Sequence, residues 1–172
     1  MTAPEPLSKP RHRPDLLPPV AQVVPHAGAM RLIDELLEAD DTACMARATV
    51  RPTQLFVDEA GMPAWIGIEY MAQTIAAWAG VQARGSGHGP RPGFLLGSRR
   101  YASDVAAFPV GSELTVRVQL EMAGDDGLSL FACTLAMDGC EVARATVSVF
   151  QPADAQALQQ ALQQADIKGQ QT

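Results

Sequence analysis

The longest apolar stretch of the chain covers residues 63–83 and predicts one buried helix. It begins at Pro63, which the first turn of a helix tolerates because the missing N–H needs no intrahelical partner there. The stretch corresponds to about six helical turns, and apolar residues fall on nearly every side of it. We therefore expect other elements to wrap this helix, so that no side of it lies on a surface.

Shorter runs with strand-like alternation predict six strands around that helix. Two runs precede it, residues 30–39 and 42–51, separated by Asp40 and Asp41 as in a hairpin. From its pattern alone, the first run could equally be a helix. Four runs follow the helix: 93–102, 112–122, 128–137 and 140–150. Two strands, a long helix and four more strands indicate an α+β domain with an antiparallel sheet curled around the helix.

The two ends of the chain differ from this central part. Residues 1–19 contain six prolines, which lock the backbone and remove donors, so we expect a flexible arm. Residues 152–172 are rich in strong helix formers and predict a helical tail. Residues 20–151 would then form a single domain, as the length of 172 residues allows.

The charge of the chain argues against some partners. The net charge is −6 and the pI is near 4.9, which disfavours a broad attraction to nucleic acid or to anionic membranes. No acidic residue occurs between Glu69 and Asp104, whereas four arginines do: Arg84, Arg91, Arg99 and Arg100. This region could dock an acidic partner, or its arginines could simply be solvated.

The cysteines and the apolar runs indicate the compartment. Three cysteines form no CxxC pair, and their odd number does not suggest a disulfide framework, so a reducing compartment fits best. The N-terminus lacks an apolar run long enough for a signal peptide, and nowhere are 18 consecutive residues apolar. We expect a soluble cytoplasmic protein. The three separated histidines predict no metal site.

Glu69 is the one strong charge in the predicted helix. Between residues 63 and 83, only the weakly acidic Tyr70 hydroxyl could also ionise. Burial of a lone carboxylate costs several kcal/mol unless it is paired, hydrogen-bonded or protonated, and an apolar site suits a general acid or base. Gln73, one turn later, could orient it. The alternative is that Glu69 grazes solvent or anchors a backbone amide.

Three segments resemble a known enzyme family. They read PHAGAMRLID (25–34), MPAWIGIEYMAQ (62–73) and GFLLGSRRYASDVAAFPVGSEL (93–114). In this order they resemble the β-hydroxyacyl-acyl-carrier-protein dehydratases of bacterial fatty-acid synthesis, and their style is similar to the divergent aryl polyene dehydratases. The resemblance covers most of residues 22–150. It implies the hot-dog fold, an antiparallel sheet wrapped around one long helix, and it favours a strand for residues 30–39.

One departure from the family pattern affects the choice of catalytic residues. The family's catalytic histidine should fall near residues 54–55, where the sequence reads PTQLFVDEAG and has no histidine. Glu69 matches the family's helix carboxylate directly. His26 is the best replacement for the histidine, because His12 lies in the proline-rich arm and His88 in a glycine-rich loop. The alternative for His26 is a structural histidine bonded to the backbone.

The resemblance implies a reaction and a set of roles. The enzyme would dehydrate a 3-hydroxyacyl chain, carried on the phosphopantetheine of an acyl carrier protein, to a trans-2-enoyl thioester without another cofactor. His26 would take the C2 proton and Glu69 would protonate the leaving hydroxyl, although either could act as acid or base. Backbone N–H groups of Ala64 and Trp65 would face the thioester oxygen, with Ala64 replacing the family's glycine.

Further expectations concern the substrate and the assembly. The predicted substrate-binding residues are Ala64, Trp65, Gln73, Arg99 and Arg100. An acyl tunnel would be lined by apolar residues such as Trp65, Ile68 and Met71, or small ones (Ala72, Ala76, Ala79) that admit flat aryl or polyene chains. Arg84 to Arg100 would dock the carrier.

The resemblance also implies a homodimer or hot-dog heterodimer in which different protomers contribute the acid and the base. Two alternatives keep the fold: a thioesterase that uses Glu69 alone, and a non-catalytic partner subunit.

Overall fold

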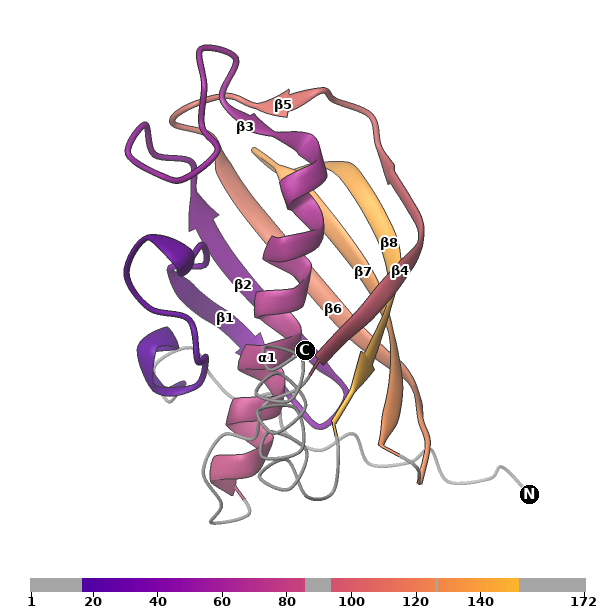
Figure 1. Ribbon diagram of the computed structural model, residues 1–172. Coiled ribbons are helices and arrows are strands. Elements are labelled where there is room, and N and C mark those ends of the chain that lie inside the picture. The colour runs from indigo at the N-terminus through magenta and orange to yellow at the C-terminus, as the bar shows by residue number, and fades with distance from the viewer. Residues whose placement is uncertain (1–16, 86–93, 126, 152–172) are drawn as a thin grey trace, which may run out of the picture.

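One antiparallel sheet and one long helix make up the computed structural model, which describes residues 17–85, 94–125 and 127–151 (Figure 1). The sheet has the strand order β1-β2-β6-β7-β8-β4, and neighbouring strands are antiparallel. Its strands are β1 (Glu35–Ala39), β2 (Ala43–Thr49), β4 (Phe94–Ser103), β6 (Glu113–Ala123), β7 (Leu128–Met137) and β8 (Cys140–Phe150). The predicted α+β architecture is confirmed.

The helix α1 (Gly67–Gly85) lies against the concave face of the sheet (Figure 1). Alternate side chains of the central strands point towards it and are fully buried, among them Val116, Leu135 and Val147. The helix buries Tyr70 and Met71 in the same core. The side of the helix that faces the sheet is buried and, within the described ranges, most of its other side is half-buried, so the sheet curls around one central helix as predicted.

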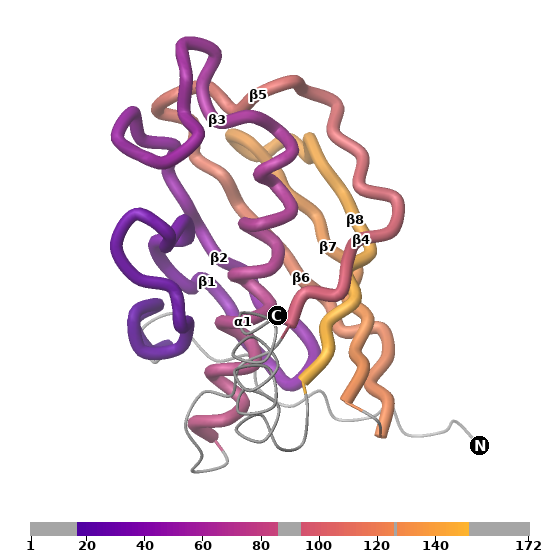
Figure 2. The backbone as a smooth tube through the Cα atoms, in the orientation of Figure 1, coloured from indigo at the N-terminus to yellow at the C-terminus, as the bar shows by residue number. Residues whose placement is uncertain are grey.

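The segment before β1 packs along α1 and contains two 3-10 helices, η2 (Val20–Gln22) and η3 (Gly28–Met30) (Figure 2). The predicted strand 30–39 is wrong in its first half, because regular pairing begins only at β1. The backbone at Met30 and Leu32 is hydrogen-bonded to the Gln73 side chain of α1 instead of to a neighbouring strand.

A short second sheet caps the N-terminal end of α1. It pairs β3 (Met62–Pro63) with β5 (Ala107–Phe108), and a 3-10 turn η4 (Ala64–Ile66) leads from β3 into the helix. The helix predicted from Pro63 therefore starts later, at Gly67, because the extended pairing holds the chain before it: the Ala64 N–H donates to the Ala106 carbonyl at 2.9 Å.

Parts of two sequence expectations fall outside the described residues. These are most of the arm 1–19, from residue 1 to residue 16, and the tail 152–172. No helix in the described ranges is long and apolar enough to cross a membrane.

Candidate active site

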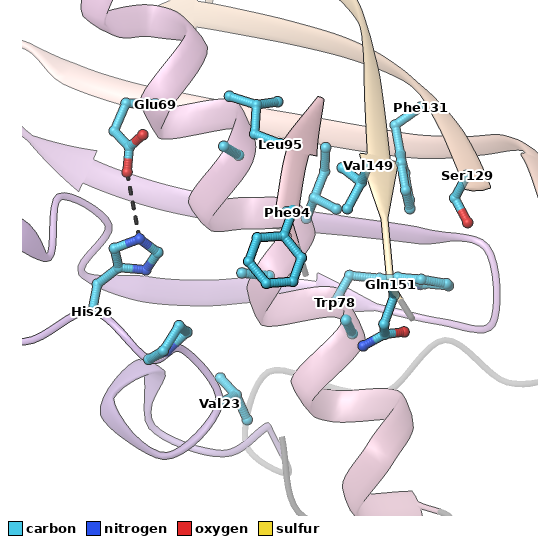
Figure 3. Close-up of a pocket in the computed structure, with 15 residues that line it drawn as sticks. Val23, His26, Glu69, Trp78, Phe94, Leu95, Ser129, Phe131, Val149 and Gln151 are labelled. Carbon is cyan, nitrogen blue, oxygen red and sulfur yellow. Dashed lines mark ion pairs between the residues drawn. The ribbon is translucent and has the colours of Figure 1, made fainter. Parts of the chain in front are cut away.

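His26 and Glu69 meet in one chain. His26 lies in the loop between η2 and η3, Glu69 lies in the first turn of α1, and the His26 Nε2 is 3.6 Å from the Glu69 Oε1 (Figure 3). This separation exceeds a hydrogen bond, so a reacting atom of a substrate can approach both groups. The side chains are 29% and 34% exposed, which leaves both accessible yet partly desolvated.

The pairing within one chain differs from the arrangement that the family resemblance implied. We expected the acid and the base to come from different protomers, whereas here the η2–η3 loop brings His26 to the helix of its own chain. Gly80 makes this possible, because a Cβ there would overlap the Val23 carbonyl and lie 2.8 Å from the Val23 Cβ. The loop can therefore lie directly on α1.

Gln73 holds the carboxylate and the loop together. Its Nε2 donates to the Glu69 Oε1 at 2.8 Å and to the Met30 carbonyl at 2.7 Å, and its Oε1 accepts the Leu32 N–H at 2.8 Å. The side chain is fully buried. Gln73 thus orients Glu69, as its spacing predicted, but it does not line the cavity described below, although it was also expected to contact the substrate.

The second ring nitrogen of His26 has no hydrogen-bond partner among the described residues, although its Nδ1 atom is buried. The imidazole is therefore not anchored to the backbone, which was the alternative interpretation of this histidine. Its position follows from the packing of the loop and from the carboxylate it faces.

An apolar cavity of about 300 Å³ opens beside this pair (Figure 3). Its volume is at the lower end of the range for small-molecule sites. The small residues Ala72, Ala76 and Ala79 face it from α1, as predicted for an acyl tunnel. The other lining residues are Val23, Pro25, His26, Glu69, Ile75, Trp78, Phe94, Leu95, Ser129, Phe131, Val149 and Gln151.

Several residues expected near the substrate lie elsewhere. Trp65 is 60% exposed and packs edge to face on Phe56, with ring centroids 5.7 Å apart. Met71 is buried in the core, and neither it nor Ile68 lines the cavity. The Ala64 N–H is already donated to the Ala106 carbonyl, so the role of Ala64 and Trp65 towards a thioester oxygen stays a prediction.

The predicted basic region is partly visible. Arg84, Arg99 and Arg100 are exposed, and Arg99 and Arg100 lie on β4, the strand that also supplies Phe94 and Leu95 to the cavity. Three residues discussed above lie outside the described residues: His12, His88 and Arg91.

The loop that lacks the family's histidine also lies next to Glu69. Leu55 and Phe56 line a crevice of about 20 Å³ that Glu69 shares. The loop supplies apolar side chains there, so the only imidazole near the carboxylate among the described residues is that of His26.

The aromatic part of the cavity was missed by the sequence reasoning. Trp78 comes from α1, Phe94 from β4 and Phe131 from β7. The inward alternation of β7 could have identified Phe131, whereas Trp78 follows Glu69 by nine residues, which is half a turn away around the helix, so its spacing gave no signal. That Phe94, Phe131 and Trp78 line the same cavity follows only from how the fold places β4 and β7 against α1.

Comparison with known proteins decides the family. The profile of the ApeP-like proteins, described as ApeP dehydratase, matches residues 18–160. This chain belongs to the ApeP-like dehydratase family. It is thus an enzyme of the hot-dog dehydratase type, and the predicted resemblance to the aryl polyene branch is confirmed.

Solved structures similar to this ApeP-like protein agree with the hot-dog fold. The dehydratase heterocomplex ApeI:P from Xenorhabdus doucetiae matches with a TM-score of 0.74 and 26% identity, covering 83% of this chain and 97% of that one. A hypothetical thioesterase with coenzyme A from Streptococcus pneumoniae TIGR4 has a TM-score of 0.54 and 14% identity, covering 69% and 88%.

The PaaI protein of the E. coli phenylacetic acid degradation operon has a TM-score of 0.56 and 10% identity, covering 70% of this chain and 80% of that one. At these identities the thioesterase and PaaI show the fold alone. No curated protein sequence matches this ApeP-like chain. Within its described residues, no three His, Cys, Asp or Glu side chains gather so that they could hold a metal ion.

Proposed function

We propose that this ApeP-like protein dehydrates a 3-hydroxyacyl thioester, carried on the phosphopantetheine of an acyl carrier protein, to the trans-2-enoyl thioester. The observation that supports this most is the His26–Glu69 pair, 3.6 Å apart, at the side of an apolar cavity. One group can take a proton while the other gives one, which is what the elimination of water requires.

The elimination starts at C2 of the acyl chain. His26 takes the C2 proton, which the thioester carbonyl acidifies, and the electrons of that C–H bond form the C2–C3 double bond. The C3–O bond breaks, and the Glu69 carboxyl group donates a proton to the departing hydroxyl to give water. Both side chains are partly exposed, so exchange with water removes the proton from His26 and restores one to Glu69, which resets the site.

The choice of a carrier protein rests on charge. Arg99 and Arg100 are exposed on β4 and form no ion pair among the described residues, and the same strand supplies Phe94 and Leu95 to the cavity wall. On the other face of the sheet these arginines line a second pocket, together with Leu128, Leu130, Thr146 and Ser148. An acidic carrier bound there would contact the strand that supplies part of the cavity wall, and its affinity should fall as salt rises. A carrier of aryl polyene intermediates fits the family to which the chain belongs.

The assembly is proposed on similar grounds. The related structure from Xenorhabdus doucetiae is a heterocomplex, and β4 stands at one end of the sheet order with Leu95 and Leu96 exposed. We infer a second hot-dog subunit against this edge, either another copy of the chain or a different dehydratase subunit. No membrane, nucleic acid or bound cofactor is part of the proposal, and the compartment we propose is the cytoplasm.

Mass spectrometry of a 3-hydroxyacyl carrier protein tests the proposal. The wild type should remove one water, whereas Glu69→Gln and His26→Ala should each slow this about 10²–10⁴-fold. Glu59→Gln, an exposed carboxylate outside the cavity, is the matched control and should react at the wild-type rate. Dehydration that survives both substitutions would contradict the assignment. Free carrier thiol without enoyl product would identify a thioesterase instead.

A mixing experiment tests whether the pair works within one chain. Complexes assembled from Glu69→Gln and His26→Ala copies should remain inactive, because each chain lacks one member of its own pair. Recovery of activity on mixing would mean that the two groups act across a subunit boundary.

A further inference from the structure

The cavity follows the axis of α1 away from the reactive pair. Glu69, Ala72, Ala76 and Ala79 all line it from successive turns of the helix. A helix rises about 1.5 Å per residue, so these positions span roughly 15 Å. The depth of the cavity therefore depends on the large side chains that line it along this stretch of the helix.

Trp78 lies at the far part of this path. Nine residues separate it from Glu69, which corresponds to roughly 13 Å along the helix axis. In Figure 3 Glu69 and Trp78 come from different turns of α1, with Phe94 between them. The Trp78 ring meets Phe131 edge to face, with centroids 5.3 Å apart and planes at 72°, so the two aromatic rings form one wall.

The fold holds this ring in place. The Trp78 Nε1 donates to the Asp40 carbonyl at 3.1 Å, and the Gln82 amide donates to the same carbonyl at 2.7 Å. Asp40 is itself fixed, because its carboxylate accepts the N–H groups of Thr42 and Ala43, each at 2.8 Å. A tryptophan anchored to a rigid turn between β1 and β2 cannot swing away to lengthen the cavity.

We propose that Trp78, backed by Phe131, is the end wall that sets which acyl chains this enzyme accepts. This inference rests on the proposed function and deepens it. An extended chain advances roughly 1.2 Å per bond, as a polypeptide backbone does, so about eleven chain bonds fit between Glu69 and Trp78. The floor of alanines and the aromatic wall favour a narrow, flat, unsaturated or aryl-ended chain over a bulky one.

The volume agrees with that substrate class. An apolar cavity of about 150 Å³ holds a benzene molecule, and the cavity here is about 300 Å³. It therefore has room for one ring together with a short conjugated chain, or for a chain of similar length without a ring.

A chain-length series tests the end wall. The 3-hydroxyacyl chain on the carrier protein is lengthened step by step. In the wild type, the dehydration rate should fall sharply once the acyl chain is longer than the distance from Glu69 to Trp78. Trp78→Ala should raise the ratio of long-chain to short-chain kcat/KM at least tenfold, because it opens the end. Ala76→Leu should lower that ratio at least tenfold, because it fills the path. Trp78→Phe keeps one aromatic ring but loses the second ring and the bond to Asp40, so it should raise the ratio less than Trp78→Ala does.

A binding measurement keeps the test separate from catalysis. Trp65 and Trp78 are the only two tryptophans, so Trp65→Phe leaves Trp78 as the single reporter. Conjugated acyl thioesters should quench its fluorescence once the chain is long enough to reach the ring, and Ala76→Leu should abolish the quenching. Length-dependent quenching without any dehydration would support the end wall while removing the proposed function. Unchanged length profiles in both Trp78→Ala and Ala76→Leu, together with no quenching, would overturn the inference.

Discussion

Gln73 is the residue on which the geometry of the reactive pair depends most. It is buried and makes three hydrogen bonds: to the Glu69 carboxylate, to the Met30 carbonyl and from the Leu32 N–H. A carboxamide is suited to this task because it donates and accepts at one end of a short side chain. No apolar residue of similar size could join helix and loop in this way.

Replacement of Gln73 should therefore affect stability and rate together. Gln73→Leu leaves the Leu32 N–H and the Met30 carbonyl unpaired, which should lower the free energy of unfolding by about 2–4 kcal/mol, as measured by urea denaturation. The dehydration rate should fall as well, because Glu69 loses its orienting donor.

Thr74→Val is the matched control for Gln73→Leu. Thr74 is also buried, but its hydroxyl donates only to the Tyr70 carbonyl within α1. Thr74→Val should lower the free energy of unfolding by about 1 kcal/mol and leave the dehydration rate unchanged. A normal rate in Gln73→Leu would show that Glu69 needs no orienting partner.

At this scale the sequence identified some site residues and not others. Glu69 stood out because a lone carboxylate in an apolar helix is unusual, and Gln73 followed from its spacing of four residues. The structure brings His26 to Glu69, although its catalytic role stays a prediction. Trp78 carried no signal, because a tryptophan in an apolar helix looks the same whether it faces a core or a cavity.

The contact between the η2–η3 segment and α1 is the element-scale feature that positions His26. Gly80→Ala tests it. Helix propensity alone favours Ala over Gly by about 1 kcal/mol, but the added methyl group would overlap Val23. We expect a net loss of about 1–3 kcal/mol in unfolding free energy, because overpacking outweighs propensity, and a slower dehydration rate.

Gly85→Ala separates these two effects. Gly85 ends the same helix, and nothing lies within 4 Å of a Cβ added there. Only propensity acts on this substitution, so it should be neutral or should stabilise the protein by up to about 1 kcal/mol. Equal effects of the two substitutions would mean that the Val23 contact does not constrain the helix.

The turn between β1 and β2 should give the protein an acid-sensitive element. Burial raises the pKa of Asp40, but hydrogen bonds from Thr42 and Ala43 lower it more, so that its pKa in the folded protein lies below its ordinary value. Ionised Asp40 therefore stabilises the folded protein. This contribution is complete above the pKa of about 3.9 in the unfolded chain, and it is lost as the pH falls through the lower pKa of Asp40 in the folded protein.

Asp40→Asn should remove this pH dependence. Because Asp40 is largely solvated, the effect should stay below about 1 kcal/mol. Thermal unfolding should show a lower Tm for the variant near pH 6, and the two proteins should converge below about pH 4. A difference that grows in acid would reverse the sign assigned to this carboxylate.

Element boundaries followed from local pattern where the pairing is local. The hairpin of β7 and β8, with Asp138 and Gly139 at its turn, agrees with the predicted runs 128–137 and 140–150. The start of α1 did not, because distant residues 106–108 hold the preceding chain extended. The start of β1 also depends on a distant residue, because the backbone before it bonds to the Gln73 side chain of α1 and not to a neighbouring strand.

At the scale of the whole molecule, the fold buries two of the three thiols. Cys44 and Cys133 are buried in the core, and burial raises the pKa of each to about 12, whereas Cys140 is exposed. The native protein should therefore react with iodoacetamide once at pH 8, and three times after unfolding, as counted by mass spectrometry. Cys140→Ser should not react until it unfolds. Two or more labels on the native protein would show that the core opens on the labelling timescale.

The outer strand β4 has a practical consequence for anyone who produces this chain. In the described residues it pairs only with β8, so its other side presents backbone donors and acceptors beside Leu96, which is 61% exposed. An unpaired edge strand of this kind can pair with any other extended segment. With a different chain as the second subunit, the polypeptide purified alone should become turbid as its concentration rises, and co-expression with that subunit should yield clear solutions.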